Sequence, residues 1–215
     1  MVVGAIAGAV LVAALVGCSP RSGAGRASRS SAAAFLAAWQ AQLSSSWSVD
    51  EVEQRTTVAG ATIAFRIHEA QRPPDSVDLA GGTISARRGQ ILIACATPPG
   101  ATTFVCREAP TSQTWAESVA AQIASLRGLL TGPRPVYEVT NLGHACYRLT
   151  VSPAVTVLPV SFGRGARYCF DPTTHAVRMS TIERVGATDT TTVLALHAPA
   201  TDADLALPAT ASYDR

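Results

Sequence analysis

Residues Ala61–His68 read ATIAFRIH, and the alternation within this stretch decides the fold. A period of two places Ile63, Phe65 and Ile67 on one face of an extended chain and polar residues such as Arg66 on the other. This pattern is typical of an antiparallel strand with one face packed on a core and the other facing solvent. The stretch therefore predicts a sheet with one covered face.

The same period extends over residues 48–107, where turn-forming sequences separate short apolar runs. Strands at such short spacing form a meander of hairpins, because a parallel sheet needs long crossover connections. The separating turns are Arg72-Pro73-Pro74-Asp75, Gly81-Gly82 and Arg87-Arg88-Gly89. Further strand-like runs occupy residues 136–140, 146–151, 155–160, 167–170, 177–184 and 190–197.

Two segments have the period of a helix instead. In residues 31–43, Phe35 and Trp39 fall on one face at helical spacing. Thr114-Trp115-Ala116-Glu117 resembles a capping box, and the helix that it begins should end at Gly132-Pro133. The order predicts an α+β fold, in which an N-terminal and a mid-chain helix pack on one face of a single curved, half-barrel-like antiparallel sheet.

Four of the five cysteines lie within these strand-like runs, and the fifth is Cys18. Four cysteines allow three pairings, and an even number is typical of disulfides in an exported domain. A hairpin centred on Thr97-Pro98-Pro99-Gly100 would place Cys95 directly opposite Cys106, within disulfide distance. We expect this pair, together with a second disulfide between Cys146 and Cys169.

The N-terminus carries a candidate export signal. Residues 1–17 are all apolar or glycine, a run too short to span a membrane comfortably but typical of a signal peptide. Leu15-Val16-Gly17-Cys18 resembles the lipobox of bacterial lipoproteins. The resemblance implies cleavage between Gly17 and Cys18, with a diacylglyceryl group and palmitate on Cys18. Two acyl chains give stable membrane anchoring.

The alternative is an uncleaved transmembrane anchor, in which the arginines that follow would hold the domain in the cytoplasm. Paired cysteines favour export instead. We therefore expect a signal peptide at residues 1–17, a flexible tether at 18–31 that is rich in Ser, Gly, Ala and Arg, and a single domain at 32–215. The expected location is the extracytoplasmic face of the cell membrane, with the lipid anchor as membrane contact.

The composition excludes some function classes. All 17 basic residues are arginine, the net charge is only +2, and no basic stripe that would mark nucleic-acid binding is present. Because the sequence has no nucleophile elbow, P-loop, zinc-protease or EF-hand motif, we expect neither catalytic residues nor a cofactor. His144 and Cys146 lack partners at the spacing of a metal site. Gly163-Arg164-Gly165 is interpreted as a turn, and Asp50-Glu51-x-Glu53 as a solvated stretch.

A wider resemblance rests on the lipobox, the order of elements and the tail Asp204-Leu205-Ala206-Leu207-Pro208. The chain resembles actinobacterial envelope lipoproteins and, more distantly, the LolA/LprG-like lipid carriers, whose curved sheet closes on helices around an apolar cavity. The resemblance implies a non-enzymatic binding protein for a lipid or other hydrophobic ligand. Candidate cavity residues are Trp39, Phe65, Trp115 and Ile123, which core packing would explain equally well.

Two other functions are also compatible with the sequence. The domain could dock another envelope protein through a sheet edge or an exposed apolar patch, without any ligand. An envelope hydrolase would instead require a convergent polar pocket. A cavity inside the folded domain would favour ligand binding over both alternatives.

Overall fold

The computed structural model describes residues 21–155 and 161–213, with side chains from residue 28 onward. Within these residues the chain forms three helices and twelve strands. The helices are α1 (Arg21–Ser44), α2 (Trp115–Thr131) and α3 (Asp202–Leu205). The strands are β1 (Trp47–Thr57), β2 (Thr62–Arg72), β3 (Asp75–Ala80), β4 (Thr83–Arg88), β5 (Ile91–Ala96), β6 (Phe104–Pro110), β7 (Tyr137–Gly143), β8 (Cys146–Val151), β9 (Gly165–Phe170), β10 (Val177–Arg184), β11 (Ala187–His197) and β12 (Ala211–Tyr213).

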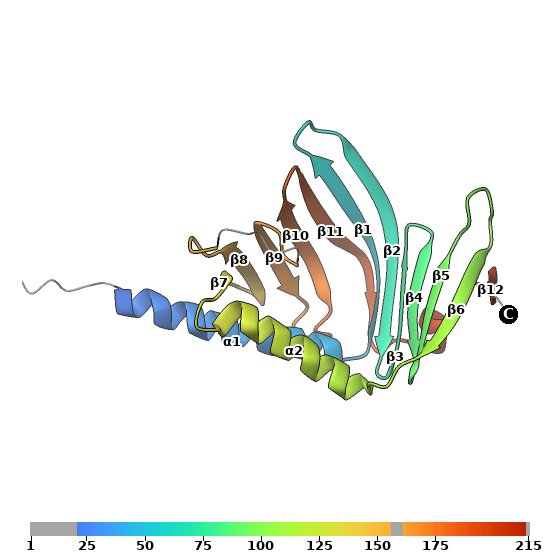
Figure 1. Ribbon diagram of the computed structural model, residues 1–215, viewed down its shortest axis with the longest axis horizontal. Helices are drawn as coiled ribbons and strands as arrows, with labels where there is room; N and C mark the ends of the chain where they lie inside the picture. The colour runs from blue at the N-terminus through green and yellow to red at the C-terminus, as the bar shows by residue number, and fades with distance from the viewer. Residues whose placement is uncertain (1–20, 156–160, 214–215) are drawn as a thin grey trace, which may run out of the picture.

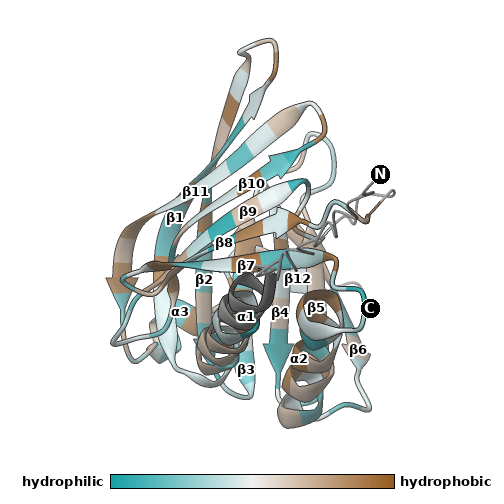
Figure 2. Ribbon diagram, turned by 90° about the vertical axis from the view of Figure 1, so that its left-hand side faces the viewer, coloured by the Kyte–Doolittle hydropathy of each residue, from teal (hydrophilic) through white to brown (hydrophobic). Residues whose placement is uncertain are grey.

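All twelve strands belong to one open sheet in the order β12-β6-β5-β4-β3-β2-β1-β11-β10-β9-β8-β7. The sheet is two meanders joined where β1 pairs with β11, and only the short β12 runs parallel to its neighbour, β6. The sheet curves around α1 and α2, which lie side by side across its inner face (Figures 1 and 2). This arrangement confirms the predicted fold class.

The helix boundaries follow from local chemistry. At the start of α2, the Thr114 hydroxyl accepts a hydrogen bond from the Glu117 amide, and the Glu117 carboxylate accepts one from the Thr114 amide at 2.8 Å. This capping box satisfies amides that have no partner within the helix. Helix α1 begins at Arg21 rather than Ser31, so residues 21–31, expected to belong to a flexible tether, are helical. The glycines and serines of this stretch do not favour helix, so its helical state follows from extension of a helix that packing already holds further along the chain.

The end of α1 is fixed by side chains from three other elements. The indole N–H of Trp47 on β1 and the side-chain amide of Gln71 on β2 both donate to the Gln42 carbonyl, at 3.0 and 2.8 Å. The indole N–H of Trp115 on α2 donates to the Leu43 carbonyl at 3.1 Å. The last carbonyls of a helix have no partner within it, so these bonds hold the helix end against the sheet and the second helix.

An aromatic core fills one half of the inner face. Phe35 of α1 is fully buried, and its ring lies 5.5 to 6.4 Å from five other aromatic rings. Edge-to-face contacts at this spacing add to the stabilisation from burial alone. The five rings belong to Trp39, Tyr147, Phe162, Tyr168 and Phe170. This packing places α1 over β7, β8 and β9.

The C-terminal tail covers the opposite face of the sheet. Leu205 of α3 is buried against Ala70 and Val77, whereas the neighbouring Gln71 bonds to α1 on the inner face. Successive residues of a strand point to opposite faces, so α3 and the two longer helices lie on different sides of the sheet. The tail showed no clear period in the sequence, and this helix was not predicted.

Two disulfides join neighbouring strands, Cys95 to Cys106 across β5 and β6 and Cys146 to Cys169 across β8 and β9. In both cases the cysteines are directly opposed in the strand register, as the hairpin argument required for the first pair. Gly17 and Cys18, the expected cleavage and acylation residues, lie outside the described residues. Among the helices described, none is long and apolar enough to cross a membrane.

Removing the central ring of the aromatic core should destabilise the fold strongly. We expect Phe35→Ala to lower the free energy of unfolding by about 3–5 kcal/mol, because the ring leaves a cavity that its neighbours cannot fill. Denaturant unfolding followed by circular dichroism measures this loss. Ile63→Ala is the matched control, because Ile63 is 65% exposed and exposed substitutions usually change stability by less than about 0.5 kcal/mol. Equal losses in the two variants would contradict this account of the core.

Candidate functional site

A cavity of about 260 Å³ lies between the C-terminal half of α1 and the centre of the sheet. We call it the concave cavity. Trp39 and Gln42 come from α1, and the remaining lining comes from five strands. Those residues are Trp47, Val49, Glu51, Glu53, Ile67, Glu69, Tyr168, Val177, Ser180 and Thr191. The cavity begins where the aromatic core ends, and Trp39 and Tyr168 belong to both.

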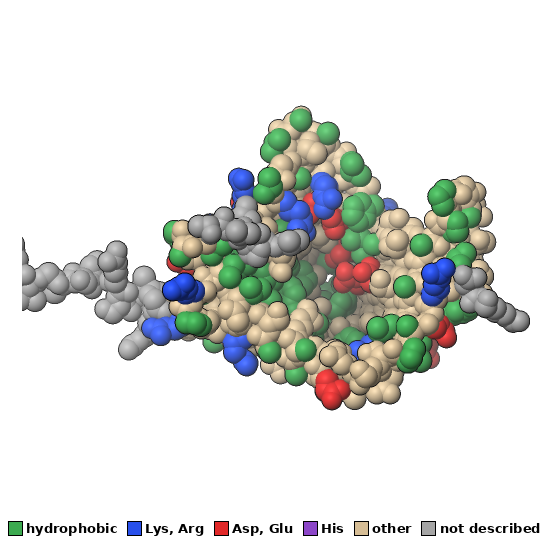
Figure 3. All heavy atoms as spheres, viewed as in Figure 1, with side chains coloured by type: hydrophobic (Ala, Val, Ile, Leu, Met, Phe, Trp, Pro, Cys, Tyr) green, Lys and Arg blue, Asp and Glu red, His purple; other side chains and the backbone are tan. Residues whose placement is uncertain are grey.

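The side chains of Glu51, Glu53 and Glu69, with Asp78 beside them, form one wall of the concave cavity, which we call the acidic wall. Glu51 is only 7% exposed and Glu53 is half-buried, which corrects the interpretation of Asp50-Glu51-x-Glu53 as a solvated stretch for these two residues, whereas Asp50 is exposed. Glu69 lies opposite Val49 in the register, and Asp78 on β3 lies opposite Glu69. A recess of about 190 Å³ shares Gln42, Trp47 and Glu69 with the cavity and adds Asp78 to its lining. Figure 3 shows acidic side chains gathered in the hollow between the sheet and the helices.

The surroundings of these carboxyl groups favour their neutral form. Burial, followed by repulsion from Glu69, Asp78 and Glu53, raises the pKa of Glu51 to about 8. Burial and the Asp78 carboxylate raise the pKa of Glu69 to about 7, although His68 on the other face lowers it. Removal from water disfavours an ion, and a nearby like charge does the same. Glu51 and Glu69 therefore titrate in the neutral pH range.

The strand alternation contains the signal that would have located this wall. Glu51 and Glu53 have the same parity along β1 as the buried Trp47 and Val49. Glu69 likewise has the same parity along β2 as the buried Ile67. Polar residues at positions that the period of two assigns to a covered face are candidates for a functional site.

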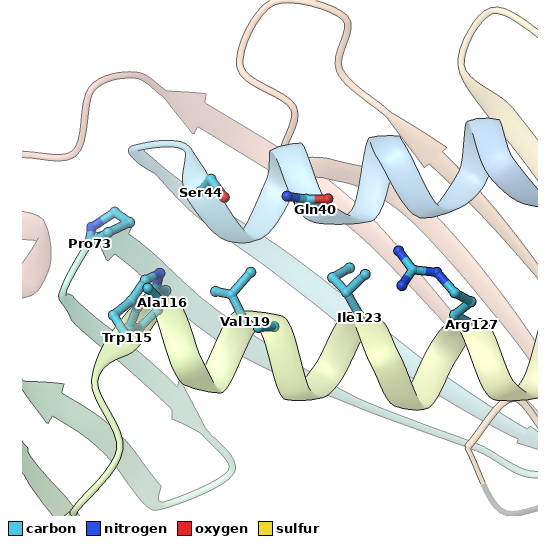
Figure 4. A pocket seen from close by; sticks show the side chains of 9 residues that line it. Gln40, Ser44, Pro73, Trp115, Ala116, Val119, Ile123 and Arg127 are labelled. Atoms are coloured by element: carbon cyan, nitrogen blue, oxygen red, sulfur yellow. The ribbon is translucent and has the colours of Figure 1, made fainter.

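A second hollow, which we call the helix groove, lies between α1 and α2 and has a volume of about 450 Å³. Val119 and Ile123 point from α2 toward α1 across it, as Figure 4 shows. Trp115 closes one end, where the Arg87 guanidinium lies 5.5 Å from its ring centre. The groove is mostly apolar, but it lacks the buried carboxylates of the concave cavity.

The structure separates the four cavity residues that the sequence suggested. Trp39 lines the concave cavity, whereas Trp115 and Ile123 line the helix groove. Phe65 is half-buried on β2, directly opposite Glu53. Ile123 is also part of the buried hydrophobic cluster that contains Phe35, so it contributes to core packing as well.

Beyond the helices, the inner face carries two exposed apolar residues on β5, Leu92 and Ala94, which we call the apolar strip. Leu92 on β5 is 44% exposed, and it lies opposite Arg87, whose guanidinium bonds to Ser118 of α2. Ala94 is also exposed, and it continues the row of opposed residues that runs from Glu69 through Asp78 and Ser85. The two apolar residues thus lie on the same face as the acidic wall, and the exposed Ser85 on β4 separates Asp78 from Ala94.

No three His, Cys, Asp or Glu side chains in residues 21–155 and 161–213 are grouped so that they could hold a metal ion. His144 has a positive φ of 51° in the turn between β7 and β8, two residues before the disulfide at Cys146. Gly163, in the glycine loop, has a φ of 57°, a conformation that glycine adopts easily. The Tyr137 hydroxyl donates a hydrogen bond to the Gly163 carbonyl at 3.0 Å, which holds this loop in its turn conformation.

No family model and no curated protein matches the sequence. Among solved structures, a LolA superfamily protein from Nitrosomonas europaea matches 82% of this chain and 97% of its own, with 10% identity and a TM-score of 0.32. A DUF1329 family protein from Desulfovibrio piger matches 86% and 99%, with 10% identity and a TM-score of 0.35. A domain described as an outer membrane lipoprotein-sorting protein, from Vibrio parahaemolyticus, matches 85% and 97%, with 8% identity and a TM-score of 0.31. Likenesses this low establish neither a family nor a ligand.

The acidic wall should make stability fall as pH rises. Between the ordinary glutamate pKa of 4.5 and the native value of about 8, the folded chain keeps a proton on Glu51 that the unfolded chain has lost. Stability decreases with pH wherever the native state binds more protons. We therefore expect the melting temperature to drop between about pH 6 and about pH 9, and Glu51→Gln to reduce that drop.

Thermal unfolding followed by circular dichroism at both pH values measures the effect. Glu138→Gln is the matched control, because Glu138 is exposed on β7 and is remote in the register from the wall. The same drop in the native chain and in Glu51→Gln would show that Glu51 does not carry the effect.

Proposed function

We propose that this chain is a membrane-tethered extracytoplasmic binding protein that holds a lipid or other amphiphilic ligand on the inner face of its sheet. The concave cavity is the observation that carries the proposal. It is lined by α1 on one side and by five strands on the other. Side chains normally fill the space between a helix and the sheet that it covers, so open space at this position supports ligand binding.

The shape of the inner face suits a ligand with a polar and an apolar end. The concave cavity offers buried polar groups to one end, and the strip at Leu92 and Ala94 offers apolar surface to the other. Sites for small molecules commonly combine apolar walls with a few placed polar groups. No step in this function requires a nucleophile or a cofactor, so we propose binding without catalysis.

The location is proposed from the sequence, with support from the cysteines. Two disulfides are typical of domains exported to an oxidising compartment. Acylation of Cys18 after removal of residues 1–17 would anchor the chain in the cell membrane, with the domain on its outer face. Such a position gives the inner face of the sheet access to envelope lipids.

Acylation should depend on Cys18. Metabolic labelling of the full chain with an alkyne analogue of palmitate, in a bacterial host that processes lipoproteins, should label the native protein. Cys18→Ser should abolish the label, because the acceptor thiol is absent. Ser19→Ala is the control and should label normally. An unlabelled native chain, or a labelled Cys18→Ser chain, would contradict the anchor.

Ligand binding should depend on the open volume of the concave cavity. Ser180 lies between Thr191 and Tyr168 in the register, is 8% exposed and lines the cavity. We expect Ser180→Phe to fill this space and to weaken binding of decyl glucoside, a neutral amphiphile, by about tenfold or more. Native mass spectrometry of the full chain carrying Cys18→Ser measures the bound fraction.

Ser125→Phe is the matched control for that experiment, because Ser125 is exposed on α2. Melting temperatures of both phenylalanine variants establish that they fold. If the native chain binds no decyl glucoside or any other amphiphile, the proposed function is wrong. Equal binding by Ser180→Phe and the native chain would place the ligand elsewhere.

A further inference from the structure

Within the described residues, no cation offsets the repulsion that Glu51 in the acidic wall receives from Glu69, Asp78 and Glu53. Glu51 is nine-tenths buried, and it makes no hydrogen bond or ion pair with any described residue. Glu69 lies beside it and is offset only by His68 on the other face, whereas Glu53 is attracted by Arg55 and Arg184, and Asp78 is exposed. A buried charge without a partner is costly, so Glu51, with Glu69 beside it, would be stabilised by an opposite charge from outside the chain.

The same face shows how the chain neutralises a carboxylate for purely structural purposes. Asp189 on β11 is 4% exposed, and the Arg55 guanidinium donates to both of its oxygens, at 2.6 and 2.9 Å. Arg184 forms a second ion pair with it. Glu53 is the neighbour of Arg55 along the same face of β1. The same two arginines also counteract the rise in the pKa of Glu53, whereas Glu51 and Glu69 receive no such contribution from an arginine in the described part of the chain.

Two polar atoms on α1 are left without partners at the same cavity. The indole nitrogen of Trp39 and the side-chain carbonyl oxygen of Gln42 are fully enclosed, and neither meets a hydrogen-bond partner in the described part of the chain. Both residues line the concave cavity opposite the acidic wall. Because protein atoms enclose both groups, a molecule in the cavity would reach either of them only if these side chains moved.

We propose that the concave cavity binds the protonated amine of a cationic amphiphile. This inference rests on the proposed function and narrows its ligand class. An alkylammonium group has three N–H donors, and the carboxyl groups of Glu51 and Glu69, which line the cavity, can accept from them. The alkyl chain would extend onto the strip at Leu92 and Ala94.

Aromatic rings strengthen the preference for a cation. Trp39, Trp47 and Tyr168 all line the cavity, and the faces of such rings attract ammonium groups. A fatty carboxylate or a phosphate would face the acidic wall with like charge, which costs free energy when water is excluded. Neutral amphiphiles would leave the wall without a counterion.

Titration of the wall supports the same ligand class. A bound cation would lower the raised pKa values of Glu51 and Glu69, so binding would release protons and strengthen as pH rises. Glu53 and Asp78 face these two groups from β1 and β3, and His68 lies behind them on the other face. The residues that line the cavity from α1, β10 and β11 are uncharged, but Arg55 on β1, Arg184 on β10 and Asp189 on β11 act on Glu53 from beside the cavity.

Three probes with the same alkyl chain test the inference: decylammonium, decyl glucoside and decanoate. Isothermal titration calorimetry of the full chain carrying Cys18→Ser should give decylammonium an affinity at least about tenfold above that of decyl glucoside, with decanoate weakest. The preference for decylammonium over decyl glucoside should be larger at about pH 8.5 than at about pH 6. The amine is protonated at both pH values, so the change reports on the carboxyl groups of the chain.

Variants separate charge recognition from structure. Glu51→Gln and Glu69→Gln should each weaken decylammonium binding about tenfold and leave decyl glucoside binding unchanged. Glu138→Gln, exposed on β7, should change neither. Because neutralising a repelled carboxylate should not harm folding, these variants remain informative.

The possible failures are distinguishable. If decylammonium and decyl glucoside bind equally well and Ser180→Phe abolishes both, the cation inference is overturned and the proposed function stands. If Glu51→Gln weakens both probes alike, Glu51 shapes the cavity without recognising charge, and the inference is likewise overturned. If none of the three probes binds the native chain, both the inference and the proposed function fail.

Discussion

Phe35 and Trp39 pack into the inner face of β7, β8 and β9, and the placement of α1 over the sheet depends on this contact. A sheet of twelve strands twists and curls, and two helices are too narrow to cover its inner face. The aromatic rings fill one half, and the helix end is then held by Trp47, Gln71 and Trp115. The concave cavity is the space left over the central strands by this uneven filling.

Polar residues at core positions give that space its chemistry. A strand that alternates toward a covered face normally places apolar side chains there, and Trp47 and Val49 follow this rule. Glu51 and Glu69 depart from it at neighbouring strands, next to the orphaned groups of Trp39 and Gln42. Departures from local rules are expected where a protein serves a function at some expense to its stability.

Much of the fold could be predicted from local sequence. The turn at Thr97-Pro98-Pro99-Gly100 determined which cysteines face each other, and Thr114 and Glu117 determined where α2 begins. Each of these depends on residues within one hairpin or one helical turn, where short-range geometry decides. The half-buried character of β2 was less well predicted, because Ile63 lies on a hairpin that projects beyond the helices (Figure 1).

The candidate site could not be predicted, because it depends on contacts between distant segments. Trp39 and Tyr168 are brought together only when α1 crosses the sheet, and the same crossing buries Glu51, which the sequence alone made look solvated. Trp115 and Ile123, grouped with Trp39 by their apolar character, face a different hollow. The position of α3 likewise depends on tertiary contacts such as that of Leu205 with Val77.

The positions of the two disulfides have a mechanical consequence. One crosslinks β5 to β6 and the other β8 to β9, and both lie toward the ends of the sheet. Strands β2, β1, β11 and β10, which form most of the floor of the concave cavity, are joined by hydrogen bonds and ion pairs such as Arg55–Asp189, with neither disulfide between them. The flanks of the sheet are therefore stiff, while its middle is compliant. A change in twist between the central strands would widen or narrow the cavity without straining either crosslink.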